Sequence, residues 1–469
     1  MLFNNPIFFI FIFFVFGLLH FSNKKYKKLI LLFSSYFFYA MWDWRFLFLI
    51  WISTVTDYLL GRKIFISKSP KEKKTYLIMS ISVNLGILGF FKYYNFFIDS
   101  ISYFFGPNTN LSTLEIILPV GISFYTFQTM SYTIDIYRNE FKPINSLLDF
   151  SNFVAFFPQL VAGPIERAKD LIPQIQNFNG IATKNLKSGV SLLVLGYTKK
   201  VLLSDNIAGM VDNYFTNFLT LDSIYALSGL ILFSLQVYFD FSGYSDIARG
   251  LSKFMGIDLM INFNQPYFSK SPSEFWRRWH ISLSSWLRDY LYIPLGGNRT
   301  GKYKIKINLM ITMVLGGLGH GASWNFVLWG ALHGLYLIIY KLFDLKNQNP
   351  NYYKRSLVKN IIKTFLCYLI ILITWLPFRS PSIHTTWLHF KKIILWEGGL
   401  NFEVISIVFI MLIFLIIIDL PSYYYRDHMF MEKLPSWLYY LIIFWIILGV
   451  FFTMLLSPTN ARPFIYFQF

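Results

Sequence analysis

The chain has 469 residues, of which 55% are hydrophobic and 20% aromatic, whereas only 14% are charged. Soluble domains carry about 25% charged residues, and this chain holds several apolar stretches of roughly 18 residues or more, so its composition excludes an ordinary soluble enzyme. The apolar runs are continuous rather than alternating, which predicts membrane-spanning helices and not a barrel. The net charge of +18 comes from Lys and Arg gathered between the apolar runs, as the positive-inside rule predicts. We therefore expect contact with membrane lipids and no binding of nucleic acid. The single cysteine, Cys367, excludes an intrachain disulfide and a cysteine-based metal site.

Five membrane spans are predicted in the first third of the chain. Their ranges are Pro6–Phe21, Leu29–Met41, Phe46–Leu60, Thr75–Ile98 and Leu114–Tyr137. Basic clusters at 24–28 and 62–74 follow the first and third runs, and placing both in the cytoplasm puts the N-terminus outside. No positive charge precedes the first run, so we expect it to be retained as a span and not cleaved as a signal peptide.

The middle of the chain does not divide into simple spans. Pro158 and Gly163 interrupt the apolar run Phe150–Gly163, which Pro164 follows, and two lysines interrupt Lys187–Ser204. One of these segments is expected to cross the membrane and the other to be re-entrant or interfacial, and the charge pattern leaves open which. Further spans are predicted at Ile224–Phe239, Thr364–Phe378, Val404–Leu420 and Trp437–Leu456. We predict one all-α membrane domain over 1–469, with about 10–12 transmembrane or re-entrant helices and the tail 457–469 outside.

Residues 273–334 contain most of the candidate site residues. A basic, Trp-rich segment comes first, and apolar residues recur in it at three- and four-residue spacing: Trp276, Trp279, Leu283, Trp286 and Tyr290. This spacing predicts one amphipathic helix in the membrane interface. Four residues are candidates for binding an anionic donor such as coenzyme A through its phosphates: Arg277, Arg278, Arg288 and Trp279. A plain cytoplasmic anchor is the alternative. His280 is predicted to face the apolar stripe, which makes it a candidate for an interior site.

The hairpin that carries His320 is the strongest candidate site. Ile307–Gly319 has 13 residues and spans roughly 20 Å as a helix, which is shorter than a hydrocarbon core of about 30 Å. Basic residues flank the hairpin on both sides, so its turn is expected within the bilayer thickness. Ionisable groups at such depth are costly and usually functional, and a neutral imidazole can act as a general base. A histidine that only packs between helices is the alternative. His333 is expected to pack or to support the site, and a hydrogen bond to a substrate is the alternative.

Other common active-site patterns are missing from the sequence. It has no Gly-x-Ser-x-Gly motif, no phosphate-binding loop with Lys-Ser/Thr, and no two-histidine spacing suited to zinc, so no metal is expected. Asp240 and Asp246 are candidates for a carboxylate pair. The simpler alternative is an ion pair between Asp246 and Arg249, which is three residues further along the helix.

The C-terminal tail, Pro463–Phe469, is too aromatic to remain in water. It is either an interfacial anchor or it inserts into an outward-facing pocket. Insertion would bring the hydroxyl of Tyr466 towards His320.

Four segments resemble the membrane-bound O-acyltransferases: Phe157–Glu166, Tyr238–Asp246, Trp279–Asn298 and Leu318–Gly334. The likeness covers nearly the whole chain. It is to the branch of the bacterial alginate and peptidoglycan O-acetyltransferases, to which the teichoic-acid D-alanyl transferase is related. One departure is Gly319, where this branch usually has Trp, and we expect it to widen the site or to change the acyl preference without abolishing activity.

The resemblance implies a ring of tilted helices around a pore, with His320 as the catalytic histidine and His280 as the second histidine of the site. It implies acetyl-CoA as the acyl donor, a substrate and not a permanently bound cofactor, and relay of the acetyl group across the bacterial cytoplasmic (inner) membrane. The implied partner is a secreted or periplasmic SGNH esterase-like transferase that modifies a polysaccharide such as peptidoglycan or alginate. The D-alanylation machinery is similar to this tail in its Phe-x-Tyr-x-x-Phe end, which Phe464, Tyr466 and Phe469 match.

These observations predict a cross-membrane O-acetyltransferase in which His320 is the general base and Tyr466 is transiently acetylated. Two other interpretations stay open. One is a polysaccharide or lipid transporter that uses His320 in a proton relay. The other is an acyltransferase that acts on a membrane lipid, or that transfers D-alanine. Loss of acetyl-CoA turnover in His320→Ala would separate an enzyme from a transporter, and the lipid-acylating enzyme would need no Tyr466.

Overall fold

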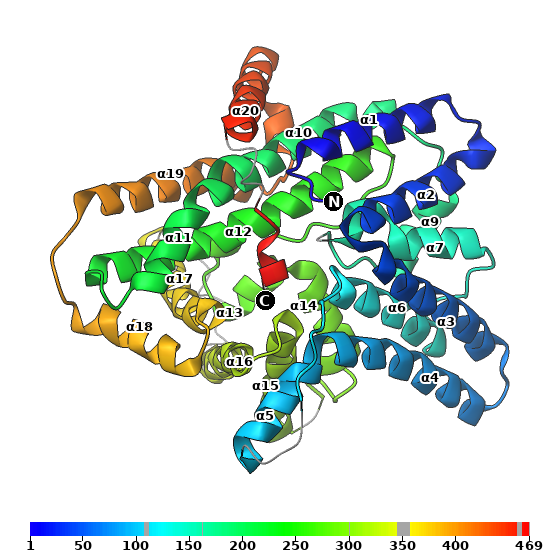
Figure 1. Cartoon of the computed structure of the whole chain (residues 1–469), viewed down its shortest axis with the longest axis horizontal. Coiled ribbons are helices and arrows are strands. Elements are labelled where there is room, and N and C mark those ends of the chain that lie inside the picture. Colours follow the sequence, from blue (N-terminus) through cyan, green and yellow to red (C-terminus); the bar gives the residue numbers. More distant parts are fainter. Residues whose placement is uncertain (107–111, 162, 300, 345–356, 457–461, 469) are drawn as a thin grey trace. The chain divides into compact units, whose positions relative to one another are not determined.

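The computed structural model describes residues 1–106, 112–161, 163–299, 301–344, 357–456 and 462–468. Every regular element in these ranges is a helix (Figure 1), as the continuous apolar runs predict. Within them, six helices are long and apolar enough to cross a membrane: Pro70–Phe105, Ser223–Phe254, Trp324–Phe343, Leu357–Arg379, Phe402–Tyr425 and Ser436–Leu456. The higher predicted number, which included re-entrant helices, stays a prediction.

The chain forms two compact units, the first comprising Met1–Leu193 and Tyr244–Met260. Its elements are α1 (Pro6–Phe21), α2 (Lys24–Asp43), η1 (Trp44–Phe46), α3 (Leu47–Ile66), α4 (Pro70–Leu88), η2 (Gly89–Tyr93), α5 (Tyr94–Phe105), α6 (Ile122–Tyr137), α7 (Leu147–Ala155), α8 (Phe157–Leu160), α9 (Ala168–Gln176) and η3 (Thr183–Asn185). The first four predicted spans correspond to helices. The fifth is wrong in its first half, because residues 112–119 are not helical and α6 begins only after Pro119 and Gly121.

The second unit comprises Val194–Gly243 and Ile261–Phe469. Two helices cross the division between the units, α10 (Leu186–Tyr197) and α12 (Ser223–Phe254). Its other elements are η4 (Thr198–Ser204), α11 (Asp205–Asn217), η5 (Pro266–Phe268), α13 (Pro272–Arg278), α14 (Ile281–Leu287), η6 (Arg288–Tyr292), α15 (Lys302–His320), α16 (Trp324–Asp344), α17 (Leu357–Arg379), α18 (Ile383–Leu395), α19 (Phe402–Tyr425), η8 (Phe430–Lys433), α20 (Ser436–Leu456) and η9 (Ile465–Gln468). The sequence did not predict α18.

The two irregular segments of the middle region differ from each other. Phe150–Gly163 is broken as predicted, because α7 ends at Ala155 and α8 is a single turn. Lys187–Ser204 is not interrupted, because its two lysines lie in the π-helical turn η4, which joins α10 directly to α11. Both lysines are buried there.

Two predicted boundaries in the second unit are wrong. The span expected to end at Phe239 continues as helix to Phe254, because Asp240 has a buried cationic partner. The single amphipathic helix expected over Trp276–Tyr290 is broken at His280 into α13 and α14, and the π-helical η6 follows α14. The common apolar stripe that the spacing predicted therefore does not exist.

The predicted hairpin is present as α15 and α16, which pack along each other (Figure 1). Both helices are longer than their apolar runs, because α15 already begins at Lys302 and α16 continues to Asp344. Glycine permits the close approach. A Cβ added at Gly317 would lie 2.1 Å from the carbonyl oxygen of Phe326, and one added at Gly330 would lie 2.3 Å from that of Met313. The hairpin therefore holds the last residue of α15, His320, at a fixed place.

Candidate active site

His320 lies at the end of α15 and is 4% exposed. Aromatic rings surround its imidazole. The ring centroids of Trp329 and Phe378 are 4.9 and 5.6 Å away, that of Tyr466 is 5.3 Å away, and that of His280 is 6.3 Å away. The structure thus brings together the three residues that the sequence singled out as catalytic.

His280 occupies the break between α13 and α14 with a φ of 42°, a left-handed conformation that is uncommon outside glycine. It is 1% exposed, and its Nδ1 lies 3.2 Å from Oδ1 of Asn262. The same oxygen accepts from the backbone N–H of Ser282, so the amide orientation is fixed and Nδ1 of His280 must be the donor. Its Nε2 therefore has the lone pair. Burial lowers the pKa of His280 to about 3, so the imidazole is neutral at physiological pH.

The described part of the tail packs into this cluster. The Tyr466 ring lies 4.7 Å from that of Phe241 and stacks on Phe464 at 5.4 Å. The hydroxyl oxygen of Tyr466 is inaccessible to solvent, and burial raises the pKa of this hydroxyl. An attack by Tyr466 therefore needs a base. Phe469, the last residue of the predicted Phe-x-Tyr-x-x-Phe pattern, lies outside the described residues.

Asp240 touches the tail, which the sequence did not predict. Its Oδ2 accepts a hydrogen bond from the backbone N–H of Ile465 at 2.7 Å, and its Oδ1 lies 2.6 Å from Nζ of Lys200. The other carboxylate of the motif, Asp246, pairs with Arg249 at 3.3 Å. Each carboxylate thus has its own cationic partner, and the alternative of a carboxylate pair is wrong.

His333 is fully buried, and the Trp329 ring contacts both its imidazole and that of His320. The indole N–H of Trp276 donates to Nδ1 of His333 at 3.3 Å, and the His333 ring lies 4.5 Å from that of Trp329. This arrangement agrees with the expectation that His333 packs or supports the site. The Trp329 indole nitrogen is also buried, and it has no hydrogen-bond acceptor among the described residues.

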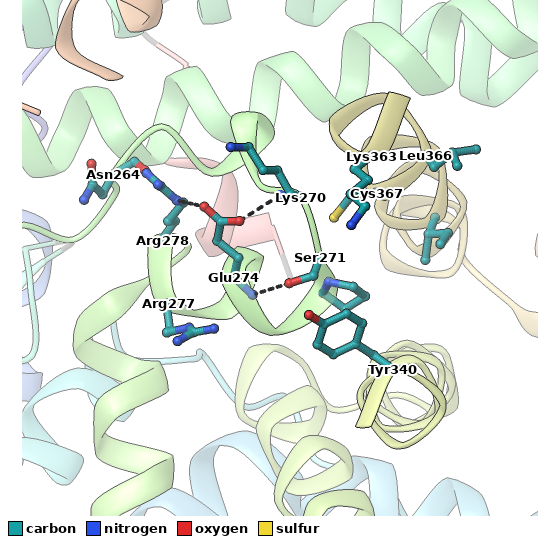
Figure 2. A pocket seen from close by; sticks show the side chains of 12 residues that line it. Asn264, Lys270, Ser271, Glu274, Arg277, Arg278, Tyr340, Lys363, Leu366 and Cys367 are labelled. Carbon is teal, nitrogen blue, oxygen red and sulfur yellow. Dashed lines mark hydrogen bonds and ion pairs between the residues drawn. The ribbon is translucent and has the colours of Figure 1, made fainter. Parts of the chain in front are cut away.

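A pocket of about 700 Å³ opens beside α13, α16 and α17 (Figure 2). Its cationic side chains are Lys270, Arg277, Arg278 and Lys363. Glu274 is the carboxylate in its lining, and Nε of Arg278 bonds it at 3.0 Å. Among the described residues, the other three cations have no carboxylate within salt-bridge distance. The pocket therefore offers an excess of positive charge to an anionic ligand.

The four predicted donor-binding residues lie in different places. Arg277 and Arg278 line the pocket. Trp279 is fully buried and packs against Trp375 at 5.1 Å, and Arg288 pairs with Asp289 at 2.7 Å. Neither Trp279 nor Arg288 is in the pocket lining, and the role of all four stays a prediction. The sequence missed Lys270, which lies just before the Trp-rich segment, and Lys363, which is far from that segment in the chain.

No group of three or more His, Cys, Asp or Glu in the described ranges is arranged to hold a metal ion.

Comparison with known proteins gives consistent matches. The model of the membrane-bound O-acyltransferase family matches residues 36–378. The chain is similar to the "Probable alginate O-acetylase AlgI" of Pseudomonas aeruginosa, with 42% identity over 394 residues that cover 82% of this chain and 74% of the relative. It is 34% identical over 434 residues to the peptidoglycan O-acetyltransferase of Helicobacter pylori, covering 86% and 80% of the two chains. The teichoic acid D-alanyltransferase of Streptococcus thermophilus is more distant, with 32% identity over 245 residues that cover 50% and 59%.

Proposed function

The chain belongs to the membrane-bound O-acyltransferase family, and from this premise we propose that it moves acetyl groups from cytoplasmic acetyl-CoA to the far side of the membrane. There the acetyl group would be used for O-acetylation of a polysaccharide, either peptidoglycan or an exopolysaccharide such as alginate. The names of the relatives support an acetyl donor and a polysaccharide acceptor. The observation that carries the mechanism is the 5.3 Å separation between the rings of His320 and Tyr466 inside a buried cluster.

The cationic pocket is the proposed docking place for the donor. Coenzyme A carries its negative charge on phosphates, which arginine and lysine bind through charge-assisted hydrogen bonds. By the positive-inside rule, the basic residues at this end of α16 and α17 indicate that it lies on the cytoplasmic side. Acetyl-CoA is available on that side. Lys270, Arg277 and Lys363 are the proposed main phosphate contacts, because no carboxylate of the described residues lies within salt-bridge distance of them.

The length of α16 fits a donor that reaches from this pocket to the catalytic histidine. Tyr340 lines the pocket and Trp329 packs on His320. These two residues are eleven positions apart on one helix, which corresponds to roughly 16 Å at 1.5 Å per residue. The donor's phosphates and its thioester are likewise separated by a long pantetheine arm. We therefore place the thioester beside His320 and the phosphates at the pocket.

The proposed first transfer is an attack by Tyr466 on the thioester. The imidazole of His320 takes the phenol proton while the Tyr466 oxygen forms a bond to the carbonyl carbon. The tetrahedral intermediate then collapses, the carbon–sulfur bond breaks, and the coenzyme A thiolate recovers the proton from the imidazolium. Acetyl-tyrosine and free coenzyme A result. His280, with a lone pair on Nε2, would orient the reacting groups by hydrogen bonding.

The second transfer would take place on the outer face. A hydroxyl of the acceptor attacks the acetyl-tyrosine ester, the carbon–oxygen bond to Tyr466 breaks, and the phenol regains its proton. Aryl esters are activated towards such attack because a phenolate is a good leaving group. We propose that the chain lies in the bacterial cytoplasmic membrane and that a secreted or periplasmic esterase-like transferase supplies this hydroxyl on the outer side. The family fold, a ring of helices around a pore, would give both faces access to His320.

Mass spectrometry of the C-terminal peptide tests this function. Purified protein is given acetyl-CoA without an acceptor, and we expect the tail to gain about 42 Da at Tyr466, because an acetyl group replaces the phenol hydrogen. Tyr466→Phe and His320→Ala should both abolish the gain. If the wild-type tail never gains acetyl, but coenzyme A is released once an acceptor is added and His320→Ala abolishes that release, the acetyl passes directly to the acceptor. If His320→Ala turns over acetyl-CoA normally, the proposed active site is wrong.

Acylation of a membrane lipid is the second candidate function, since the site would be shared and only the acceptor would differ. It predicts that Tyr466→Phe retains transfer to lipid. Labelled acetyl-CoA and membrane vesicles distinguish the two, because label should appear on the tail in one case and in the lipid extract in the other.

A further inference from the structure

The described tail is bound to carboxylates at two points. The backbone N–H of Ile465 donates to Oδ2 of Asp240 at 2.7 Å. Three residues earlier, Nη1 of Arg462 lies 2.6 Å from Oδ2 of Asp212, whose Oδ1 accepts from Arg379 at 2.8 Å. The Arg462 pair is partly exposed and the Asp240 contact is buried. The hydrogen bond between Asp240 and the Ile465 N–H is therefore the contact from which water is excluded.

Asp240 is an unusual residue for its position. It lies within α12, one of the helices apolar enough to cross the membrane, and is 2% exposed. A carboxylate at such depth is costly unless it is paired. Lys200 pairs with its Oδ1 at 2.6 Å and with Asp205 at 2.9 Å. This pairing compensates the charge and leaves Oδ2 to the tail.

We propose that Asp240 is a positioning residue, which docks the tail through the Ile465 N–H and so holds the next residue, Tyr466, against His320. The inference rests on the proposed function in so far as Tyr466 carries the acetyl group. Because the bonded tail atom belongs to the backbone, the contact fixes the register of the chain and not the identity of residue 465. Phe464 adds an apolar contact on the other side of this point, since its ring lies 5.0 Å from that of Phe241.

Two substitutions remove the contact from opposite sides. In Asp240→Asn, one side-chain atom faces the Lys200 ammonium and the other faces the Ile465 N–H. Both neighbours are donors, so the amide NH2 meets a donor in either orientation. In Ile465→Pro the donor itself is lost. Ile465 is the first residue of η9, a position where proline is tolerated because its N–H is not needed by the helix.

The accessibility of position 466 provides the test. In a Cys367→Ser background, which removes the single cysteine, a Tyr466→Cys variant in membrane vesicles is labelled with a maleimide. A docked tail should label slowly. Loss of a hydrogen bond to a charged group shifts the docked-to-undocked ratio by roughly tenfold or more, so Asp240→Asn and Ile465→Pro should each raise the labelling rate by about that factor. The double variant should be no faster than the faster single variant, because both remove one contact.

Asp419→Asn is the matched control. Asp419 is also a buried carboxylate of the second unit, and it accepts from the Tyr238 hydroxyl at 2.7 Å. It should leave labelling slow. If Ile465→Pro labels as slowly as its parent, or if Asp419→Asn accelerates labelling as much as Asp240→Asn does, the proposal is overturned. If Asp240→Asn does not accumulate in the membrane, the result for Ile465→Pro decides alone.

Acetylation of the tail separates this proposal from the function on which it rests. With Tyr466 present, Ile465→Pro should lower the rate of tail acetylation by about tenfold or more, while coenzyme A binding is unchanged. Normal acetylation in Ile465→Pro would refute a positioning role for Asp240. If the wild-type tail gains no acetyl but labelling responds as expected, tail docking stands and the acetyl-tyrosine step fails.

Discussion

The close approach of α15 and α16 makes Gly317→Ala the sharpest test of how His320 is positioned. A Cβ at this residue would lie 2.1 Å from the Phe326 carbonyl oxygen, whereas real Cβ atoms essentially never come within 3.0 Å of another heavy atom. Because the obstacle is backbone, the two helices must separate by about 0.9 Å. Overpacking of this kind costs about 1–3 kcal/mol, and a displacement of about 1 Å at a catalytic group costs about 100-fold in rate. His320 is three residues further along the same helix, so we expect kcat to fall about 100-fold.

Gly319→Ala is the matched control for this prediction. A Cβ at Gly319 would meet open space, and both glycines lie in the same helix, so each change brings the same helix-propensity gain of about 1 kcal/mol. The difference between the two variants therefore isolates the close approach. Release of coenzyme A and thermal unfolding of the purified variants measure it. We expect Gly319→Ala to keep turnover within about twofold and to unfold at the same or a higher temperature.

Wild-type turnover in Gly317→Ala would refute the reasoning, since the hairpin spacing would then not position His320. Equal loss in both variants would also contradict it. That result would favour a role for Gly319 in the width of the site, as expected from the resemblance to the family, in which Trp is usual at this position.

Three further variants probe the donor pocket and the layer around His320. Arg277→Gln should raise KM for acetyl-CoA about tenfold or more at low salt and less at high salt, whereas an unchanged KM together with a raised KM in Arg288→Gln would place the donor phosphates at η6 instead. Trp329→Phe keeps an aromatic ring, although a smaller one, and removes a buried indole N–H next to His320. If this N–H binds the carbonyl oxygen of the thioester during attack, kcat should fall about 100-fold or more with KM unchanged, and an unchanged kcat would assign it no part in the reaction. Trp276→Phe leaves Nδ1 of His333 without its donor, so unfolding should become easier by about 1–3 kcal/mol, whereas equal stability would show that this bond contributes nothing.

The sequence predicted the helical class, most spans and the His320 hairpin because these depend on local properties. Continuous apolar runs determine spans, and the glycines between Ile307 and Gly334 mark the close approach of two helices. The break at His280 was missed because its cause is not local. The backbone oxygen of Asn262 accepts from Ile281 N–H, and the Asn262 side chain accepts from Ser282 N–H. These bonds end the helical path at a residue that three- and four-residue periodicity would have continued.

The Asp240 contact shows what kind of site a sequence does not reveal. A charged residue after an apolar run usually marks the end of a span, because an unpaired carboxylate is costly in hydrocarbon. Lys200 removes that cost from 40 residues away. The sequence did contain a signal for this pair, since one apolar run has an unexplained acidic residue and another has an unexplained basic residue. The tail contact left no such signal, because its donor is a backbone N–H 225 residues from Asp240 and any residue except proline would supply it. What the tail sequence must preserve is therefore the spacing, since inserting one residue between Ile465 and Tyr466 would keep the hydrogen bond and turn the phenol away from His320.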